Sequence, residues 1–155
     1  MRFFLMAATA SLFTLTTAMM IAQEAQAVQD TPVTINGVEA VCTGVGSAKD
    51  DPRWAAYPVK VVLATSGGAN VANAHVTLTK GRNEVAGLDC DAPWILFKAP
   101  SGAYTATATL IGGSGRSASS NLTTNGSTQK ETTITFPLPS NGASLPAGNT
   151  APAGQ

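Results

Sequence analysis

The chain has 155 residues, with nine basic side chains, nine acidic side chains and one histidine, and its formal net charge at pH 7 is zero. Zero net charge without a basic cluster argues against nucleic acid or an anionic membrane surface as a partner. The two cysteines lack Cys-x-x-Cys spacing and His75 has no partner at ligand spacing, so we expect no metal and no cofactor.

The first 27 residues predict an export signal. Arg2 precedes an apolar run from residue 3 to residue 21, and Ala25-Gln26-Ala27 places small residues where a signal peptidase reads the chain. A transmembrane anchor is the alternative, but Thr and Ser residues dilute the run. We expect cleavage between Ala27 and Val28 and no stable membrane insertion of the mature chain. The expected location is the periplasm, and the alternatives are secretion and association with the cell surface.

The remaining chain is long enough for one domain of ordinary size. Residues 28–35 are interpreted as an N-terminal segment and residues 36–137 as a β-sandwich domain. Residues 138–155 are rich in Pro, Gly and Ala without apolar periodicity, which is typical of a disordered tail.

The cysteine pair predicts a disulfide. Exported chains with an even number of cysteines usually have them paired, and only the connectivity Cys42–Cys90 is possible here. The bond closes a loop of about 48 residues, for which the chain-entropy model gives about 4 kcal/mol.

Alternating apolar and polar residues predict strands, and no amphipathic helix of useful length follows the signal. The alternation is clearest at 59–63, 75–78, 104–110 and 132–136, and Gly- or Pro-containing turns separate these segments. Short strands with such punctuation indicate an all-β fold, an antiparallel Greek-key sandwich of about seven strands.

The stretch from Pro93 to Tyr104 predicts a hairpin. Trp94, Leu96 and Tyr104 are expected to fill one core region from neighbouring strands. Pro100 sets φ at the entry to the turn, and Gly102 permits the positive φ of a short connection. The alternative for Trp94 is an exposed aromatic residue in a binding surface.

An ordered set of motifs resembles a known family. The set comprises Gly44-Val45-Gly46, VKVVLATSGG, HVTLT, Ala92-Pro93-Trp94 and Pro100-Ser101-Gly102-Ala103-Tyr104. It resembles the carboxypeptidase regulatory-like (transthyretin-like) β-sandwich, and is similar to uncharacterised exported proteins of Gram-negative bacteria that carry this domain. The resemblance covers about residues 36–136, although Ala92 stands where glycine is commoner. It implies a fold and a compartment but no activity.

Enzymes on related folds are not matched at their catalytic residues. Transthyretin-like hydroxyisourate hydrolases need several histidines and a C-terminal Tyr-Arg-Gly-Ser, whereas this chain has one histidine and ends in Ala-Gly-Gln. Intradiol dioxygenases bind iron through tyrosines and more than one histidine, so their ligand set is incomplete here.

The functional expectation is a non-enzymatic domain that binds a protein or glycan partner of unknown identity. The predicted contact surface is the loop 44–57, with Arg53 and Trp54 exposed and Tyr57 beside them. Capping of the open end of the sandwich explains the Trp54–Tyr57 cluster equally well. Two other functions stay open: a carbohydrate-binding module that stacks sugars on coplanar Trp54 and Tyr57 rings, and a hydrolase that uses His75 with a nearby carboxylate and a serine.

Overall fold

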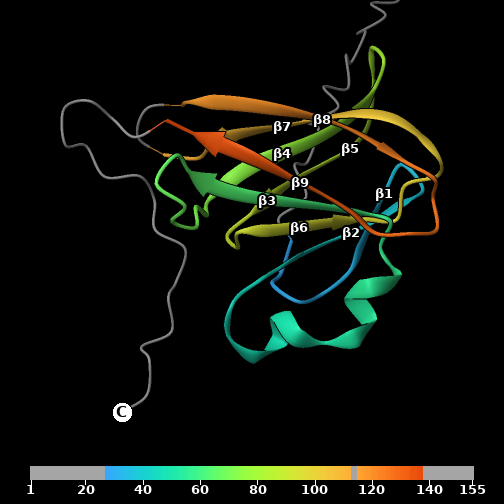
Figure 1. Cartoon of the computed structure of the whole chain (residues 1–155), viewed down its shortest axis with the longest axis horizontal. Coiled ribbons are helices and arrows are strands. Elements are labelled where there is room, and N and C mark those ends of the chain that lie inside the picture. The colour runs from blue at the N-terminus through green and yellow to red at the C-terminus, as the bar shows by residue number, and fades with distance from the viewer. Residues whose placement is uncertain (1–26, 113–114, 138–155) are drawn as a thin grey trace, which may run out of the picture.

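A computed structural model describes residues 27–112 and 115–137, which form two packed β-sheets (Figure 1). Residues 1–26 of the predicted signal and the predicted tail 138–155 lie outside the described residues. The strands are β1 (Val33–Ile35), β2 (Val38–Thr43), β3 (Val59–Thr65), β4 (Ala74–Lys80), β5 (Asn83–Cys90), β6 (Trp94–Phe97), β7 (Gly102–Leu110), β8 (Ser117–Thr124) and β9 (Lys130–Phe136). Two 3₁₀ helices, η1 (Gly46–Asp50) and η2 (Pro52–Ala56), lie between β2 and β3. Within the described ranges, no helix is long and apolar enough to cross a bilayer.

The expected all-β fold is confirmed, but the strand count and the strand directions differ from the prediction. A five-stranded sheet has the order β1-β2-β6-β3-β9, and a four-stranded sheet has the order β5-β4-β7-β8. The described residues therefore contain nine strands rather than about seven. The sandwich is also not wholly antiparallel, because the connection after β8 crosses to the other sheet and brings β9 alongside β3 in the parallel direction.

The five-stranded sheet begins before residue 36. β1 lies inside the segment 28–35 and pairs with β2 in register Val33↔Ala40 to Ile35↔Val38. Asn36 and Gly37 join the two strands with φ values of 50° and 82°. Positive φ at both central residues is the requirement of a type I′ hairpin turn, for which Asn-Gly is the preferred pair.

The core lies between the two sheets, and the alternation in the sequence assigned its residues correctly. From β3, Val59, Val61 and Leu63 are fully buried, as are Ile134 and Phe136 of β9. The inward face of β7 is Tyr104, Ala106, Ala108 and Leu110, which are all buried. The predicted disulfide is present: Cys42 of β2 and Cys90 of β5 join the two sheets through the core, with their Cα atoms 5.7 Å apart.

The expected hairpin between Pro93 and Tyr104 is wrong. β6 belongs to the five-stranded sheet and β7 to the four-stranded sheet, so the chain crosses from one sheet to the other. Tyr104 does enter the main core, but Trp94 is only half-buried and Leu96 packs in a separate cluster. Successive strand residues point to opposite faces, and Trp-Ile-Leu-Phe is apolar on both, so its pattern does not reveal which residues face inward.

The Pro-x-Gly-x-Tyr motif has a structural role in this crossing. The Tyr104 hydroxyl donates a hydrogen bond to the Pro100 carbonyl at 2.8 Å. This bond resembles the tyrosine corner of β-sandwiches, in which a tyrosine hydroxyl reaches back to the backbone a few residues upstream. It fixes the direction in which the chain leaves one sheet and enters the other.

Candidate functional site

The predicted contact residues Trp54 and Tyr57 are buried. Their side chains are 5% and 3% exposed, and they pack with Val41 and Leu96 in a second apolar cluster on the outer face of the five-stranded sheet. The expectation that Trp54 is exposed is therefore wrong. The physical reason is that β6 is apolar on both faces and β2 adds Val41 to the outer face, so this face also needs a cover, which η2 supplies.

The aromatic pair also does not form a sugar-binding platform. The ring centroids of Trp54 and Tyr57 are 5.9 Å apart and the ring planes are tilted by 59°. Because the rings are neither coplanar nor exposed, this version of the carbohydrate-binding hypothesis is wrong. The pair covers a sheet face rather than the open end of the sandwich.

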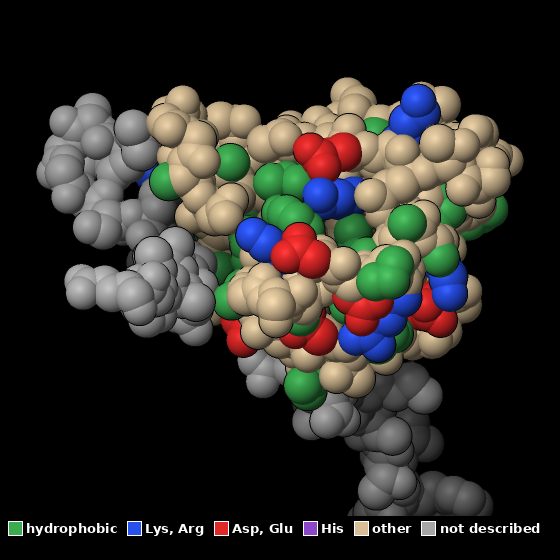
Figure 2. Space-filling view, turned by 60° about the horizontal axis from the view of Figure 1, so that its bottom comes forward, with side chains coloured by type: hydrophobic (Ala, Val, Ile, Leu, Met, Phe, Trp, Pro, Cys, Tyr) green, Lys and Arg blue, Asp and Glu red, His purple; other side chains and the backbone are tan. Residues whose placement is uncertain are grey.

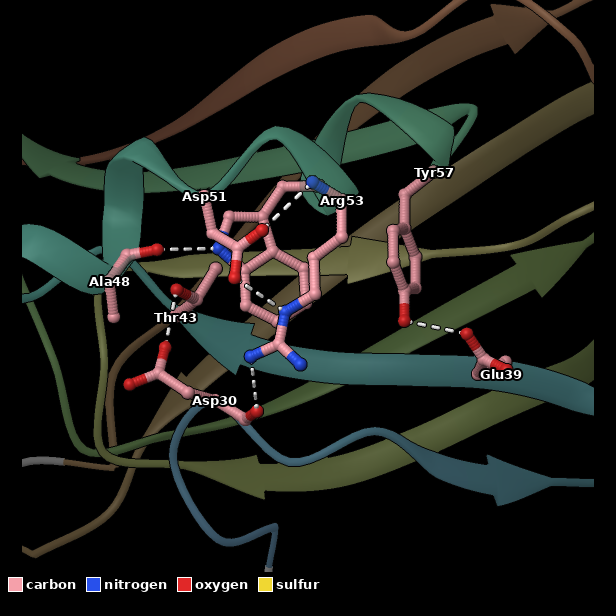
Figure 3. Close-up of polar contacts among 8 residues, drawn as sticks. Asp30, Glu39, Thr43, Ala48, Asp51, Arg53 and Tyr57 are labelled. Atoms are coloured by element: carbon pink, nitrogen blue, oxygen red, sulfur yellow. Dashed lines mark hydrogen bonds and ion pairs between the residues drawn. The ribbon is translucent and has the colours of Figure 1, made fainter.

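Hydrogen bonds join η2 to η1 and to the β8–β9 connection, and Figure 3 shows the first of these contacts, at Ala48. The indole Nε1 of Trp54 donates to the Ala48 carbonyl at 2.7 Å. From the β8–β9 connection, Nε2 of Gln129 donates to the carbonyls of Trp54 at 2.7 Å and Tyr57 at 3.1 Å. These contacts make the segment a fixed part of the fold.

Arg53 is half-exposed, and two nitrogens of its guanidinium contact acceptors within the chain. Nε lies 2.9 Å from Oδ2 of Asp51, and Nη2 donates to the Asp30 carbonyl at 3.2 Å (Figure 3). The guanidinium also lies 4.1 Å from the centre of the Trp54 ring. Arg53 therefore ties the N-terminal segment to η2.

Tyr57 belongs to a second satisfied polar group. Its hydroxyl donates to Oε1 of Glu39 at 2.6 Å, and Nζ of Lys98 lies 2.9 Å from the same oxygen (Figure 3 shows the tyrosine and the glutamate). Burial raises the pKa of Tyr57 above its ordinary value, and its bond to the carboxylate acts in the same direction. The bonds from Tyr57 and Lys98 lower the pKa of Glu39.

Trp94 lines a small groove between η2 and the sheet. Nζ of Lys60 lies 3.6 Å from the centre of the Trp94 ring and 2.9 Å from Oε2 of Glu131. The ring also rests against Gly44, where an added Cβ would come within 2.6 Å of the Trp94 Cγ. The groove has a volume of about 180 Å³. Figure 2 views the molecule from the side of η1 and η2, where basic and acidic side chains lie next to one another.

A larger cavity lies where the N-terminal segment passes the end of β5, and we call it the amino-terminal cavity. Its volume is about 460 Å³, and its lining includes Val28, Asp89, Asp91 and Ile111. Val28 is 69% exposed and Ile111 is 45% exposed, and they are the exposed large hydrophobic residues of the described chain. This site could not be predicted from the sequence, because its residues are distant along the chain and show no shared pattern.

His75 has an acidic neighbour on the outer face of the four-stranded sheet. Its Nδ1 lies 2.6 Å from Oδ1 of Asp89, which is its register partner on β5. On the other side His75 is opposite Thr109 of β7, whose hydroxyl lies 2.7 Å from that of Ser117. The carboxylate that the hydrolase hypothesis requires is present, but within the described residues no hydroxyl is hydrogen-bonded to His75.

The described residues contain no group of three or more His, Cys, Asp or Glu side chains that could hold a metal ion. No family model and no curated protein matches the chain. The functional proposal therefore depends on the fold and on the geometry of these sites. The described residues form a two-sheet all-β domain with one disulfide, a buried aromatic cluster whose polar atoms are hydrogen-bonded, and a cavity that two exposed apolar side chains help to line.

Proposed function

We propose that the protein is an exported, non-enzymatic β-sandwich domain that binds a protein partner through the amino-terminal cavity. One observation carries this proposal: the two exposed large hydrophobic side chains of the described residues, Val28 and Ile111, line the same cavity. Single exposed apolar residues are ordinary, whereas two that line the same concave surface favour a binding site. A cavity with a volume of about 460 Å³ accepts one or two side chains of a partner.

The character of the lining favours a protein over a glycan. No aromatic side chain lines the amino-terminal cavity, so a sugar ring has no flat apolar face on which to stack. Trp94 does not offer such a face elsewhere, because Lys60 and Gly44 already contact its ring. A protein partner is the better complement, because its side chains offer apolar groups to Val28 and Ile111 and polar groups to the rest of the lining.

Export and family membership are parts of the same proposal. The disulfide Cys42–Cys90 supports an oxidising compartment, and the signal pattern of residues 1–27 supports the periplasm. The two sheets and the tyrosine corner at Pro100–Tyr104 support a carboxypeptidase regulatory-like, Greek-key sandwich.

Site-specific crosslinking in the producing cells tests partner binding. A photoreactive residue replaces Ile111, and the matched control replaces Ser119, an exposed residue on the outer face of β8. We expect a single protein adduct in the periplasmic fraction from position 111 and none from position 119. The purified partner is then expected to bind an Ile111→Ser variant at least tenfold more weakly than the parent and to bind Ser119→Ala unchanged. Equal affinity for the folded Ile111→Ser variant contradicts the proposal.

The contact between His75 and Asp89 favours one second candidate, a hydrolase in which His75 is the general base. Its test is turnover of a panel of simple esters by the purified protein. The hypothesis expects hydrolysis that His75→Gln abolishes and Thr77→Val, on the same face of β4, leaves intact. Absence of turnover, or turnover that survives His75→Gln, excludes it.

A further inference from the structure

The peptide bond between Ala27 and Val28 lies at the wall of the amino-terminal cavity. The amide of Ala27 donates to the Asp89 carbonyl at 3.3 Å, and Val28 lines the cavity. The chain is held on the other side as well, because the amide of Thr31 donates to the Val28 carbonyl at 3.1 Å and that of Asp30 to the Cys42 carbonyl at 2.8 Å. The bond at which we propose that the export signal is removed is therefore positioned by the folded domain.

The charges of this cavity are unbalanced. Its lining includes the carboxylates of Asp89 and Asp91 and neither Lys nor Arg. His75 occupies the Asp89 carboxylate. The Asp91 side chain is exposed, and no hydrogen bond or ion pair joins it to another described residue. A single cation placed here would have one free carboxylate as its partner.

We propose that processing supplies this cation: the new α-ammonium group of Val28 pairs with the Asp91 carboxylate and fixes the segment that forms one wall of the cavity. The inference rests on the proposed export of the protein. Water hydrolyses the Ala27–Val28 bond in a signal peptidase, the carboxylate leaves with Ala27, and the amine that stays on Val28 takes up a proton. An α-amino group has an ordinary pKa of about 7.7–8.0, so this group is mostly charged at pH 7.

The pairing links maturation to the binding surface. In the precursor, the amide of Ala27 holds this wall through its bond to the Asp89 carbonyl. Cleavage removes that donor, and a charge-assisted contact from the ammonium of Val28 to Asp91, which lines the same cavity, replaces it. Val28 thereby keeps its apolar side chain beside Ile111, where the proposed partner contact needs it.

The test measures the α-amino pKa of the mature protein that begins at Val28, by NMR after ¹³C-reductive methylation of a small fraction of its amines. We expect a pKa raised by about half a unit to one unit above the ordinary value, because a neighbouring carboxylate favours the charged form. Asp91→Asn should remove most of the shift. Asp50→Asn, which deletes an equally exposed carboxylate on η1, should leave it.

Three results overturn the proposal: an α-amino pKa at its ordinary value, equal effects of Asp91→Asn and Asp50→Asn, or a first residue other than Val28 in the exported protein. Neither pKa measurement needs a partner, so the terminus pairing fails or holds independently of partner binding. A normal pKa together with the Ile111 adduct overturns only the role of the terminus. A first residue other than Val28 instead overturns the proposed cleavage site, on which the export proposal and this pairing both depend.

Discussion

Replacing Trp54 by alanine should lower the free energy of unfolding by about 3 kcal/mol, even though the residue lies outside the main core. The side chain is 5% exposed and packs against Val41, Tyr57 and Leu96. Buried Trp→Ala changes cost about 3–5 kcal/mol through lost transfer energy and the cavity left behind. We place this one at the lower end, because a cluster that covers an outer sheet face can collapse partly into the gap.

Urea unfolding with the disulfide intact measures the effect, and the fluorescence of Trp94 remains as the probe in the variant. Ala55→Ser is the matched control, since Ala55 lies next to Trp54 on η2 but is exposed, and it should change stability by less than about 0.5 kcal/mol. A loss below about 1 kcal/mol for Trp54→Ala at an unchanged m-value would refute the assignment of Trp54 as a buried anchor. The exposed-loop interpretation predicts that small loss.

Three further changes test other parts of the fold. Gly44→Ala should lower the free energy of unfolding by at least about 2 kcal/mol, since φ is +103° and the new Cβ would meet the adjacent tryptophan ring. The new Cβ of Gly46→Ala meets nothing within 4 Å, so this variant should lose only about 1 kcal/mol. Thermal unfolding of the two variants compares these losses. Replacing the Cys42–Cys90 pair by two alanines should cost about 4 kcal/mol for a loop of 48 residues in urea unfolding, and a loss below about 1 kcal/mol would contradict the entropic account. The pKa of Glu39 is lowered in the folded state, so its stabilisation is present above its unfolded pKa and is lost as the pH falls through the lowered value. Glu39→Gln should therefore reduce the loss of stability between pH 7 and pH 3. The reduction should be less than about 1 kcal/mol, because the carboxylate is partly exposed. An unchanged pH profile would show that the ion pair of Glu39 and Lys98 contributes nothing to stability.

The parts of the fold that follow a local pattern were predictable. Strand alternation identified the buried residues of β3, β7 and β9, because one face of each is apolar and the other polar. The cysteine count identified the disulfide, since only one pairing exists. β8 was not identified, because its sequence, SASSNLTT, has a single large apolar residue, Leu122, on its inward face.

The error at Pro93–Tyr104 has a different origin. Two apolar strands joined by a Pro-x-Gly turn look alike whether they pair in one sheet or cross between two. The distinction depends on which neighbours are available, and β6 pairs with β2 and β3 rather than with β7. No residue between 93 and 104 carries that information.

The same consideration explains why the candidate site moved from the loop 44–57 to residues of several distant segments. A Trp-Ala-Ala-Tyr sequence in a loop attracts a functional interpretation, but Val41 and Leu96 lie beneath it on the outer sheet face. Covering these side chains lowers the free energy more than exposing two rings would. Val28 and Ile111 attract no attention alone, because single exposed aliphatic residues are common. They become informative only when the fold puts them in one cavity with Asp91, whose carboxylate has no hydrogen bond or ion pair to another described residue. In this domain, Trp54 and Tyr57 are structural, although the local sequence pattern does not predict their burial. Val28 and Ile111, which stay exposed in the folded domain, are the candidates for recognition.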